Sequence, residues 1–122
     1  MTVDTDYDVL ARMALVPRVL EARGLDVTPS IRKKFSGSKY IEMVEILDII
    51  FEDEIGHVKI GNSWYKYLCK ERGIDPVKTF DQLIKKHIGT NLRGPFNIEA
   101  RLLSDFTQTE LDYLEHPELL KN

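Results

Sequence analysis

The first stretch with a clear helical period covers residues 8–23. Its apolar side chains recur at steps of three and four residues: Val9, Met13, Val16 and Leu20. Pro17 lacks a backbone N–H, so we expect it to bend this helix without ending it. Gly24 is expected to end the helix, because glycine enters the left-handed conformation at little cost. The segment LDVTPS (25–30) that follows is then predicted to be a loop, since the residue before a proline favours extended backbone.

Residues 40–72 form the longest periodic run. One stripe of the predicted helix combines apolar side chains with an acid and a histidine: Leu47, Ile50, Glu54, His57, Gly61, Trp64 and Leu68. Most charged residues of the run lie on its other faces, as solvated positions do. A helix of this length spans roughly 45 Å, which is too long for a compact domain of this size to cover alone. Helices of this kind belong to bundles, and Gly73 is expected to end this one.

Three shorter helices are predicted after it, over residues 76–88, 97–106 and 108–115. Helix-start signals precede the predicted helices: Asp4 or Asp6 for the first one, then Asp75 with Pro76, Asn97, and the Thr107–Glu110 capping box. No segment alternates apolar and polar residues as a half-buried strand does. The pattern therefore predicts a single all-α domain over residues 1–122.

Composition narrows the class of protein. The 17 Lys and Arg residues against 20 Asp and Glu residues give a net charge of −3. This balance argues against a phosphate-neutralising surface, so nucleic-acid binding is not indicated. The N-terminus lacks the order of a signal peptide, and no stretch approaches about 18 consecutive apolar residues, so we expect no membrane span. A single cysteine, Cys69, cannot form an intrachain disulfide, and a reducing, cytoplasmic setting is the default expectation.

The candidate chemistry of the chain lies at Glu54 and His57. These residues are three apart, so both side chains project from the apolar stripe of the long helix. A buried carboxylate and imidazole are costly unless something compensates them, and a metal ion is one such compensation. Glu-x-x-His is the spacing that di-iron carboxylate bundles use. A lone Glu-x-x-His also occurs by chance in many helical proteins, and Asp53 rules out the histidine that a zinc-protease motif needs before its glutamate.

Glu21 adds a second candidate carboxylate from the preceding helix. It lies at the edge of that helix's apolar face, where a neighbouring-helix ligand of a Glu-x-x-His site belongs. The ordinary alternative is a surface ion pair between Glu21 and Arg18 or Arg23. The sequence alone leaves both interpretations open.

Three longer motifs carry a resemblance to a known family. They are ARMALVPRVLEARGLDVTP (11–29), DEIGHVKIGNSWYKYLC (53–69) and RGPFNIEAR (93–101). In this order, over about residues 7–115, they resemble a bacterial family of ferritin-like proteins of unknown function. The resemblance implies a ferritin-like four-helix bundle with a di-iron or related two-metal site.

The same resemblance implies which residues would be ligands. Glu21 matches the single-glutamate helix, and Glu54 with His57 matches the second Glu-x-x-His pair. Asp53 matches the acid before that glutamate, which in such sites often orients a histidine ligand. Iron is the expected metal, with manganese or zinc as alternatives.

The chain resembles only the C-terminal half of these proteins. A two-metal carboxylate site needs about four carboxylates and two histidines, whereas Glu21, Glu54 and His57 provide half of that set. We therefore expect half of a bundle, with two long antiparallel helices and short C-terminal helices. Either a second copy of the chain or a missing N-terminal half would complete it, and the homodimer is the favoured expectation.

Two functions from different classes follow. The first is a metal-binding protein that activates oxygen as a di-iron oxidase or hydroxylase of unknown substrate. The second is a non-catalytic helical dimerisation or interaction fragment without metal, in which Glu54 and His57 are hydrogen-bonded interface residues.

Four other positions receive ordinary structural interpretations. Trp64 and His87 are expected in the core, and Cys69 is expected to pack as a small hydrophobe. The segment Arg93–Arg101 is compatible with anion binding at the start of a short helix, although helix capping explains it equally well.

Overall fold

The computed structural model describes residues 7–120, and every regular element within them is helical. In chain order these elements are α1 (Val9–Leu15), the π-helical η1 (Val16–Glu21), α2 (Ala22–Lys34), the short 3-10 helix η2 (Ser38–Tyr40), α3 (Ile41–Arg72), α4 (Pro76–His87), α5 (Ile98–Leu103), α6 (Gln108–Glu115) and the 3-10 helix η3 (Pro117–Leu120). The predicted all-α class is confirmed. None of the helices in this range is long and apolar enough to cross a membrane.

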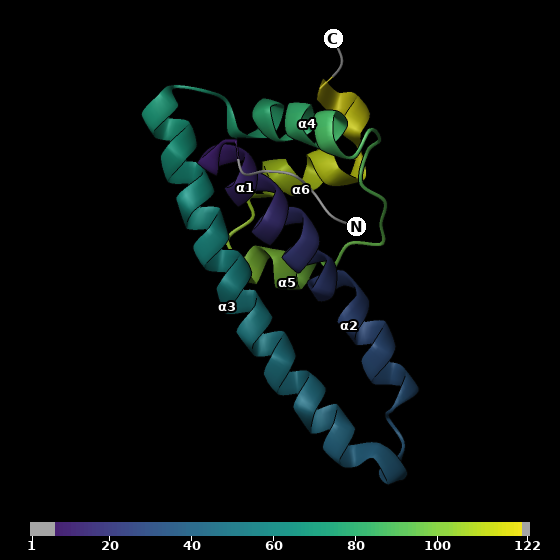
Figure 1. Cartoon of the computed structure of the whole chain (residues 1–122). Helices are drawn as coiled ribbons and strands as arrows, with labels where there is room; N and C mark the ends of the chain where they lie inside the picture. The colour runs from purple at the N-terminus through teal and green to yellow at the C-terminus, as the bar shows by residue number, and fades with distance from the viewer. Residues whose placement is uncertain (1–6, 121–122) are drawn as a thin grey trace.

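The first three elements join into one continuous rod that runs antiparallel to α3 (Figure 1). This rod packs along α3, and the three shorter helices α4, α5 and α6 gather around one end of the pair. The two long antiparallel helices and the short C-terminal helices expected from the sequence are therefore present.

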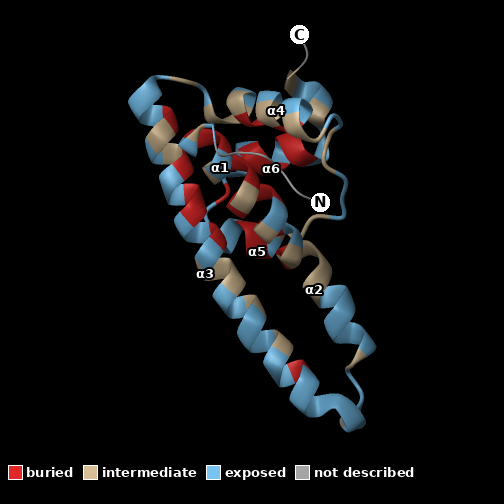
Figure 2. Cartoon of the chain, viewed as in Figure 1, coloured by how far each residue is buried: buried red, intermediate tan, exposed pale blue. Residues whose placement is uncertain are grey.

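The hydrophobic core lies at the end of the pair where the shorter helices gather (Figure 2). Its largest fully buried apolar side chains are Tyr65, Phe80, Leu15, Leu25, Ile84 and Leu111. The other end, residues 29–51, forms a distal arm in which only Val44 is buried among the side chains that the structure describes. An exposed ion pair of 2.7 Å between Arg32 Nε and Asp48 Oδ1 joins its two helices.

The close approach of the rod to α3 depends on Pro17 and Gly61. Pro17 lacks the N–H that a regular α-helix uses, and the rod contains a π-helical turn, η1, around it. The proline ring packs directly on Gly61, where an added Cβ would overlap the Pro17 side chain. Glycine at position 61 therefore lets the rod approach α3 this closely.

The prediction that the first helix ends at Gly24 is wrong, because α2 continues through Pro29 to Lys34. A proline inside a helix leaves the carbonyl four residues earlier without its usual donor. Here that carbonyl belongs to Leu25, and it accepts a hydrogen bond of 3.0 Å from Asn97 Nδ2. A side chain from far along the sequence thus compensates the proline, and the helix persists where local signals predict a loop.

The other helix starts follow their sequence signals closely. Asp75 accepts backbone hydrogen bonds at the start of α4, Asn97 caps α5, and Thr107 with Glu110 forms the predicted capping box of α6. Asp8 caps α1, while Asp4 and Asp6 lie outside the described residues. The main difference is α5, which ends at Leu103 and not at residue 106.

Candidate metal centre

Glu54 and His57 lie near the middle of α3, on the same side of the helix. Glu54 Oε2 is 3.8 Å from His57 Nδ1, as expected for residues three apart. The Glu54 side chain is 24% exposed, whereas that of His57 is 62% exposed. The expectation that both groups are buried within the chain therefore holds partly for Glu54 and is wrong for His57.

Glu54 extends from α3 toward the rod. A Cβ placed on Gly24 would lie 3.7 Å from Glu54 Cγ, so the stem of the acid packs against the start of α2. Glu21, the last residue of η1, comes close enough to Glu54 to affect its ionisation. Glu21 of the rod and His57 of α3 also line the same cleft, and the role of Glu21 as a ligand stays a prediction.

The ionisation of Glu54 reflects this environment. Partial burial raises the pKa of Glu54 because it disfavours the charged form, and the negative charge of Glu21 raises it further. His57 opposes both effects through its own charge and hydrogen bonding, but the net direction is upward. Glu21 and Glu54 therefore form a like-charge pair that a cation would relieve.

The ordinary alternative for Glu21 was an ion pair with Arg18 or Arg23. Arg18 is fully buried and pairs with Glu110 instead. Arg23 donates a hydrogen bond of 3.3 Å to the backbone oxygen of Arg93. Both arginines thus have other partners, so the structure does not support that alternative.

A cleft of about 400 Å³ lies beside these residues, between the rod and α3. Glu21 and His57 line it together with Trp64 and Ile60. Both of these apolar side chains are more than half exposed, so the prediction that Trp64 lies in the core is wrong for this chain.

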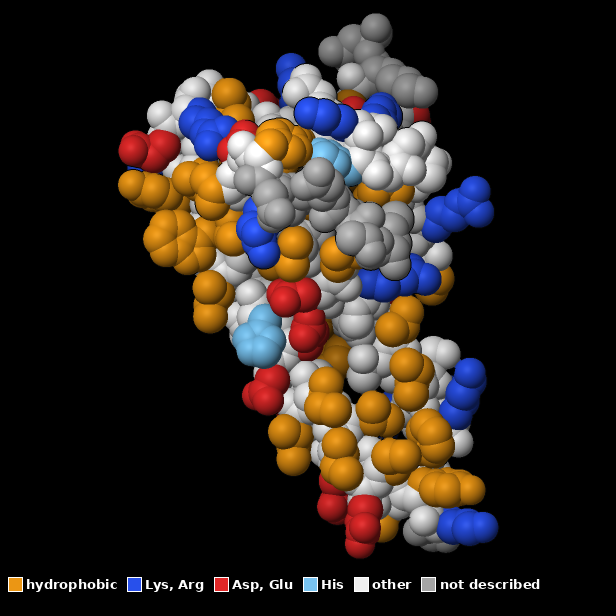
Figure 3. All heavy atoms as spheres, viewed as in Figure 1, with side chains coloured by type: hydrophobic (Ala, Val, Ile, Leu, Met, Phe, Trp, Pro, Cys, Tyr) orange, Lys and Arg blue, Asp and Glu red, His pale blue; other side chains and the backbone are white. Residues whose placement is uncertain are grey.

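Trp64 belongs to a longer exposed apolar stripe along α3. Its members recur mostly at helical steps of three or four residues: Met43, Ile46, Ile50, Ile60, Trp64 and Tyr67. Figure 3 shows a histidine beside acidic side chains partway along the molecule, with hydrophobic side chains above and below them on the same face. The carboxylates and the imidazole therefore occupy a polar interruption of an otherwise apolar surface.

The donor set within the chain is incomplete. Across residues 7–120, no three His, Cys, Asp or Glu side chains converge closely enough to hold a metal ion by themselves. Asp53 is exposed and forms no hydrogen bond or ion pair with the described part of the chain, so its orienting role stays a prediction. Carboxylate oxygens with an imidazole nitrogen suit iron, manganese or zinc, but a complete site would need further ligands from outside residues 7–120.

Sequence reasoning missed two buried ion pairs on the core side of the rod. Arg18 pairs with Glu110, and Arg101 pairs with Asp26 at 2.7 Å. In the sequence, Asp26, Arg101 and Glu110 occupy positions that resemble ordinary surface charges. Arg18 could have been noticed, because it lies among the buried positions of its helix.

The remaining expectations concern single residues. Cys69 is buried, as predicted, and burial raises the pKa of its thiol. His87 is half-buried, and its Nε2 lies 2.8 Å from the hydroxyl of Tyr7. In the Arg93–Arg101 segment, the Asn97 side chain caps α5 by accepting from the Ala100 N–H.

Comparison with known proteins places these features in a family. Over 114 residues the chain is 51% identical to an uncharacterized protein of Haemophilus influenzae, an alignment that covers 93% of this chain. The chain spans about 40% of the length of that relative. No solved structure matches the chain. Residues 1–112 match the family described as "Protein of unknown function (DUF455)", and the chain therefore belongs to this family.

Proposed function

We propose that this chain contributes Glu21, Glu54 and His57 to a ferritin-like two-metal carboxylate site, and that the metal-loaded protein is an oxygen-activating oxidase or hydroxylase. The observation that carries the proposal is that Glu54 and His57 lie 3.8 Å apart on α3, while Glu21 of the antiparallel rod lines the same cleft as His57. The negative charge of Glu21 disfavours the ionised form of Glu54, and a bound cation would offset that effect. The resemblance of the three sequence motifs to ferritin-like proteins supports the same function.

Each of the three residues has a defined part in this proposal. Glu21 and Glu54 would supply carboxylate oxygens from opposite helices, and His57 would supply a neutral nitrogen. This donor chemistry fits iron first, and manganese or zinc as alternatives. Iron bound there would supply oxygen activation, the three side chains would hold it, and the cleft beside Trp64 would admit a substrate.

The proposal includes a second half-bundle that covers the apolar stripe of α3. Two copies related by a two-fold axis would bring together four carboxylates and two histidines, which is the ligand set of di-iron bundles. Burial of Ile50, Ile60 and Trp64 against the partner would stabilise the pair, because each is more than half exposed in the single chain. The Haemophilus influenzae relative is longer than this chain, so a further segment of the same protein is the other candidate source of ligands.

A second candidate function is metal-free helical association. The exposure of His57 and the lack of a three-ligand group within residues 7–120 favour it. In that case the apolar stripe binds another helical surface, and Glu54 and His57 form hydrogen bonds across the interface.

Metal content and mass in solution test the proposal together. The purified chain is expected to be a dimer that retains about two iron ions per pair after gel filtration. Glu54→Gln and His57→Ala should each lose most of the metal while circular dichroism shows an unchanged helix content. Glu52→Gln is the matched control, since Glu52 is an exposed acid two residues from Glu54 on a different face of α3.

The other outcomes separate the two candidates. A dimer without metal that neither substitution affects would overturn the metal proposal and support helical association. A metal-free monomer would contradict completion by a second copy. The same metal analysis on the longer relative then decides whether a preceding segment supplies the missing ligands.

A further inference from the structure

A second cavity opens on the side of the rod where residues 88–97 pass. Its volume is about 340 Å³, within the range of about 300–1,000 Å³ that small-molecule sites occupy. It shares no lining residue with the cleft beside Glu21 and His57. A ligand of this cavity would therefore contact none of the residues that line the cleft at the candidate metal centre.

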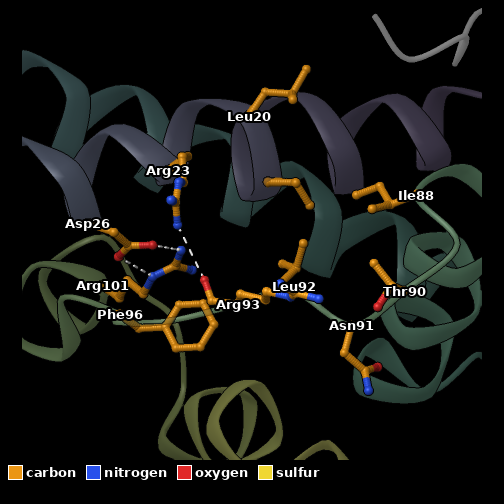
Figure 4. A pocket seen from close by; sticks show the side chains of 11 residues that line it. Leu20, Arg23, Asp26, Ile88, Thr90, Asn91, Leu92, Arg93, Phe96 and Arg101 are labelled. Atoms are coloured by element: carbon orange, nitrogen blue, oxygen red, sulfur yellow. Dashed lines mark hydrogen bonds and ion pairs between the residues drawn. The ribbon is translucent and has the colours of Figure 1, made fainter. Parts of the chain in front are cut away.

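The walls of this cavity are mostly apolar. They are formed by Val19, Leu20, Ile88, Leu92 and Phe96. Figure 4 shows the rod above and the 88–96 segment below, with Ile88 and Leu92 on the lower side of the rod, Phe96 beside Arg101, and Leu20 on the upper side of the rod. An apolar body of the size of one aromatic ring fits such a space, because contact with these side chains removes its surface from water.

Arg101 forms the polar end of the cavity. The residue is only 2% exposed, and one edge of its guanidinium binds Asp26, with Nε at 3.0 Å from Oδ1 and Nη2 at 2.7 Å from Oδ2. Its third nitrogen, Nη1, is buried without a hydrogen-bond partner. In Figure 4 this free end of the guanidinium turns away from Asp26, toward Arg93 and the residues that line the cavity.

An unpartnered charged donor in the interior is costly, and most native structures provide a partner. The ion pair with Asp26 explains two of the three nitrogens of Arg101, because it ties α2 to α5. It does not explain Nη1. An oxyanion that enters from the cavity would accept a charge-assisted hydrogen bond from this nitrogen.

The net positive charge of the residues that line the cavity also favours an anion as its ligand. Arg23 and Arg93 are exposed lining residues, and together with Arg101 they place three guanidinium groups against the single carboxylate of Asp26. Two positive charges therefore remain in excess. Asn91 also lines the cavity, with its amide directed away from Arg101 (Figure 4).

We propose that this cavity binds a small organic anion, with a carboxylate or phosphate group at Arg101 and an apolar body between Leu20, Leu92 and Phe96. The proposal does not rest on the metal centre or on the oxidase function.

Titration of the 122-residue chain with four probes, followed by NMR amide shifts, tests this directly. Benzoate and phenyl phosphate carry an anion on an aromatic ring, benzamide is the neutral counterpart of benzoate, and inorganic phosphate lacks the ring. For ligands this small, we expect dissociation constants on the order of millimolar for the two aromatic anions. Their shifts should centre on Asn91, Leu92 and Arg101. Whichever aromatic anion binds more tightly identifies the head group as carboxylate or phosphate.

Benzamide and inorganic phosphate are both expected to bind at least about tenfold more weakly, because one lacks the charge and the other the apolar contacts. Equal binding of benzamide and benzoate would overturn the role of the arginines. An absence of saturable shifts at the cavity with both aromatic anions would overturn the proposal as a whole.

Variants at exposed lining positions avoid the risk of unfolding that a change at Arg101 carries. Leu20→Glu places a carboxylate at the cavity and should abolish anion binding, whereas Leu20→Gln should retain most of it. Arg93→Gln should weaken binding by about fivefold, which is a typical effect for a partly exposed charge. Arg32→Gln is the charge-matched control, because Arg32 pairs with Asp48 in the distal arm. The proposal fails if Leu20→Glu and Arg93→Gln bind the anions as Arg32→Gln does.

Discussion

Arg18 and Glu21 lie three residues apart in η1, yet their charged groups have different surroundings on the two sides of the rod. Arg18 enters the core, pairs with Glu110, and stacks against the rings of Tyr65 and Phe80, with its Cζ 4.1 and 4.4 Å from their centroids. Glu21 faces α3, where its nearest charged neighbour of known effect is another carboxylate, Glu54. Arg18 therefore has an opposite charge beside it, whereas the neighbour that affects Glu54 from the rod is the like charge of Glu21.

This contrast separates a structural use of buried charge from a functional one. Burial by itself would raise the pKa of Glu110, but the charge of Arg18, a hydrogen bond from the Thr107 backbone and the charge of Lys66 outweigh it, so the net pKa is lowered. The pKa of Glu54 moves upward because partial burial and the charge of Glu21 outweigh the opposing effect of His57. Like charges placed near each other at a surface are more typical of a binding site than of a structural ion pair.

The largest expected effect comes from breaking the buried ion pair between Arg18 and Glu110. Glu110→Ala leaves Arg18 buried without a counter-charge and also removes the capping box of α6, so the free energy of unfolding should fall by about 3–5 kcal/mol. Urea denaturation followed by circular dichroism measures it. Glu115→Ala on the same helix is the control, because Glu115 is exposed. A loss no larger than that of the control would show that the pair does not stabilise the core side.

An intermediate effect is expected where the rod packs on α3 through the contact between Pro17 and Gly61. Gly61→Ala forces a methyl group into the Pro17 ring and should destabilise the chain by about 1–3 kcal/mol. Gly56→Ala is the matched control five residues earlier on α3, where a Cβ meets nothing within 4 Å. Because alanine favours helix, that variant should gain about 0.5–1 kcal/mol. Thermal unfolding of both variants checks the opposite signs, and the same sign in both would contradict the close packing.

The smallest effect is expected at Glu54, where α3 faces the rod. In the chain freed of metal by a chelator, Glu54→Gln should raise the unfolding midpoint at neutral pH, since it removes a charge that burial and Glu21 disfavour. The raised pKa means that the wild type loses stability as pH rises through the folded pKa of Glu54. The difference between the two proteins should therefore vanish below about pH 4, where the carboxyl is protonated in both states.

Thermal unfolding of both proteins over a pH series checks this prediction. A variant that is less stable than the wild type at neutral pH would show that Glu54 is held by favourable interactions and not by opposing charge.

Local sequence signals predicted the helices well wherever local energetics decide them. The predicted helix over 40–72 matches α3, and the capping residues of α4, α5 and α6 lie where their patterns place them. The first helix was predicted to stop at Gly24 because Gly24 and Pro29 are strong local breakers. The error arose because Asn97, which accommodates Pro29, comes from a segment whose position no local rule supplies.

The candidate site was predicted in its residues but not in its burial. Helical spacing places Glu54 and His57 on one side of α3, as expected, and Glu21 of the antiparallel rod lines the same cleft as His57. The stripe that contains them was expected to be buried, whereas Trp64 and His57 are largely exposed. Hydrophobic periodicity shows that a face prefers to be covered, and it cannot show which chain covers it.

The amino-acid sequence alone determined the helical class and most helix boundaries, because these depend on interactions within a few residues, whereas the three candidate ligands stay a prediction. Tertiary structure decided that Arg18 and Arg101 are buried with acidic partners, that Pro17 seats on Gly61, and that a cavity forms beside Arg101. Each of these features joins residues far apart along the chain. Their energies depend on burial and on the charge of distant neighbours, and both exist only once the helices have packed.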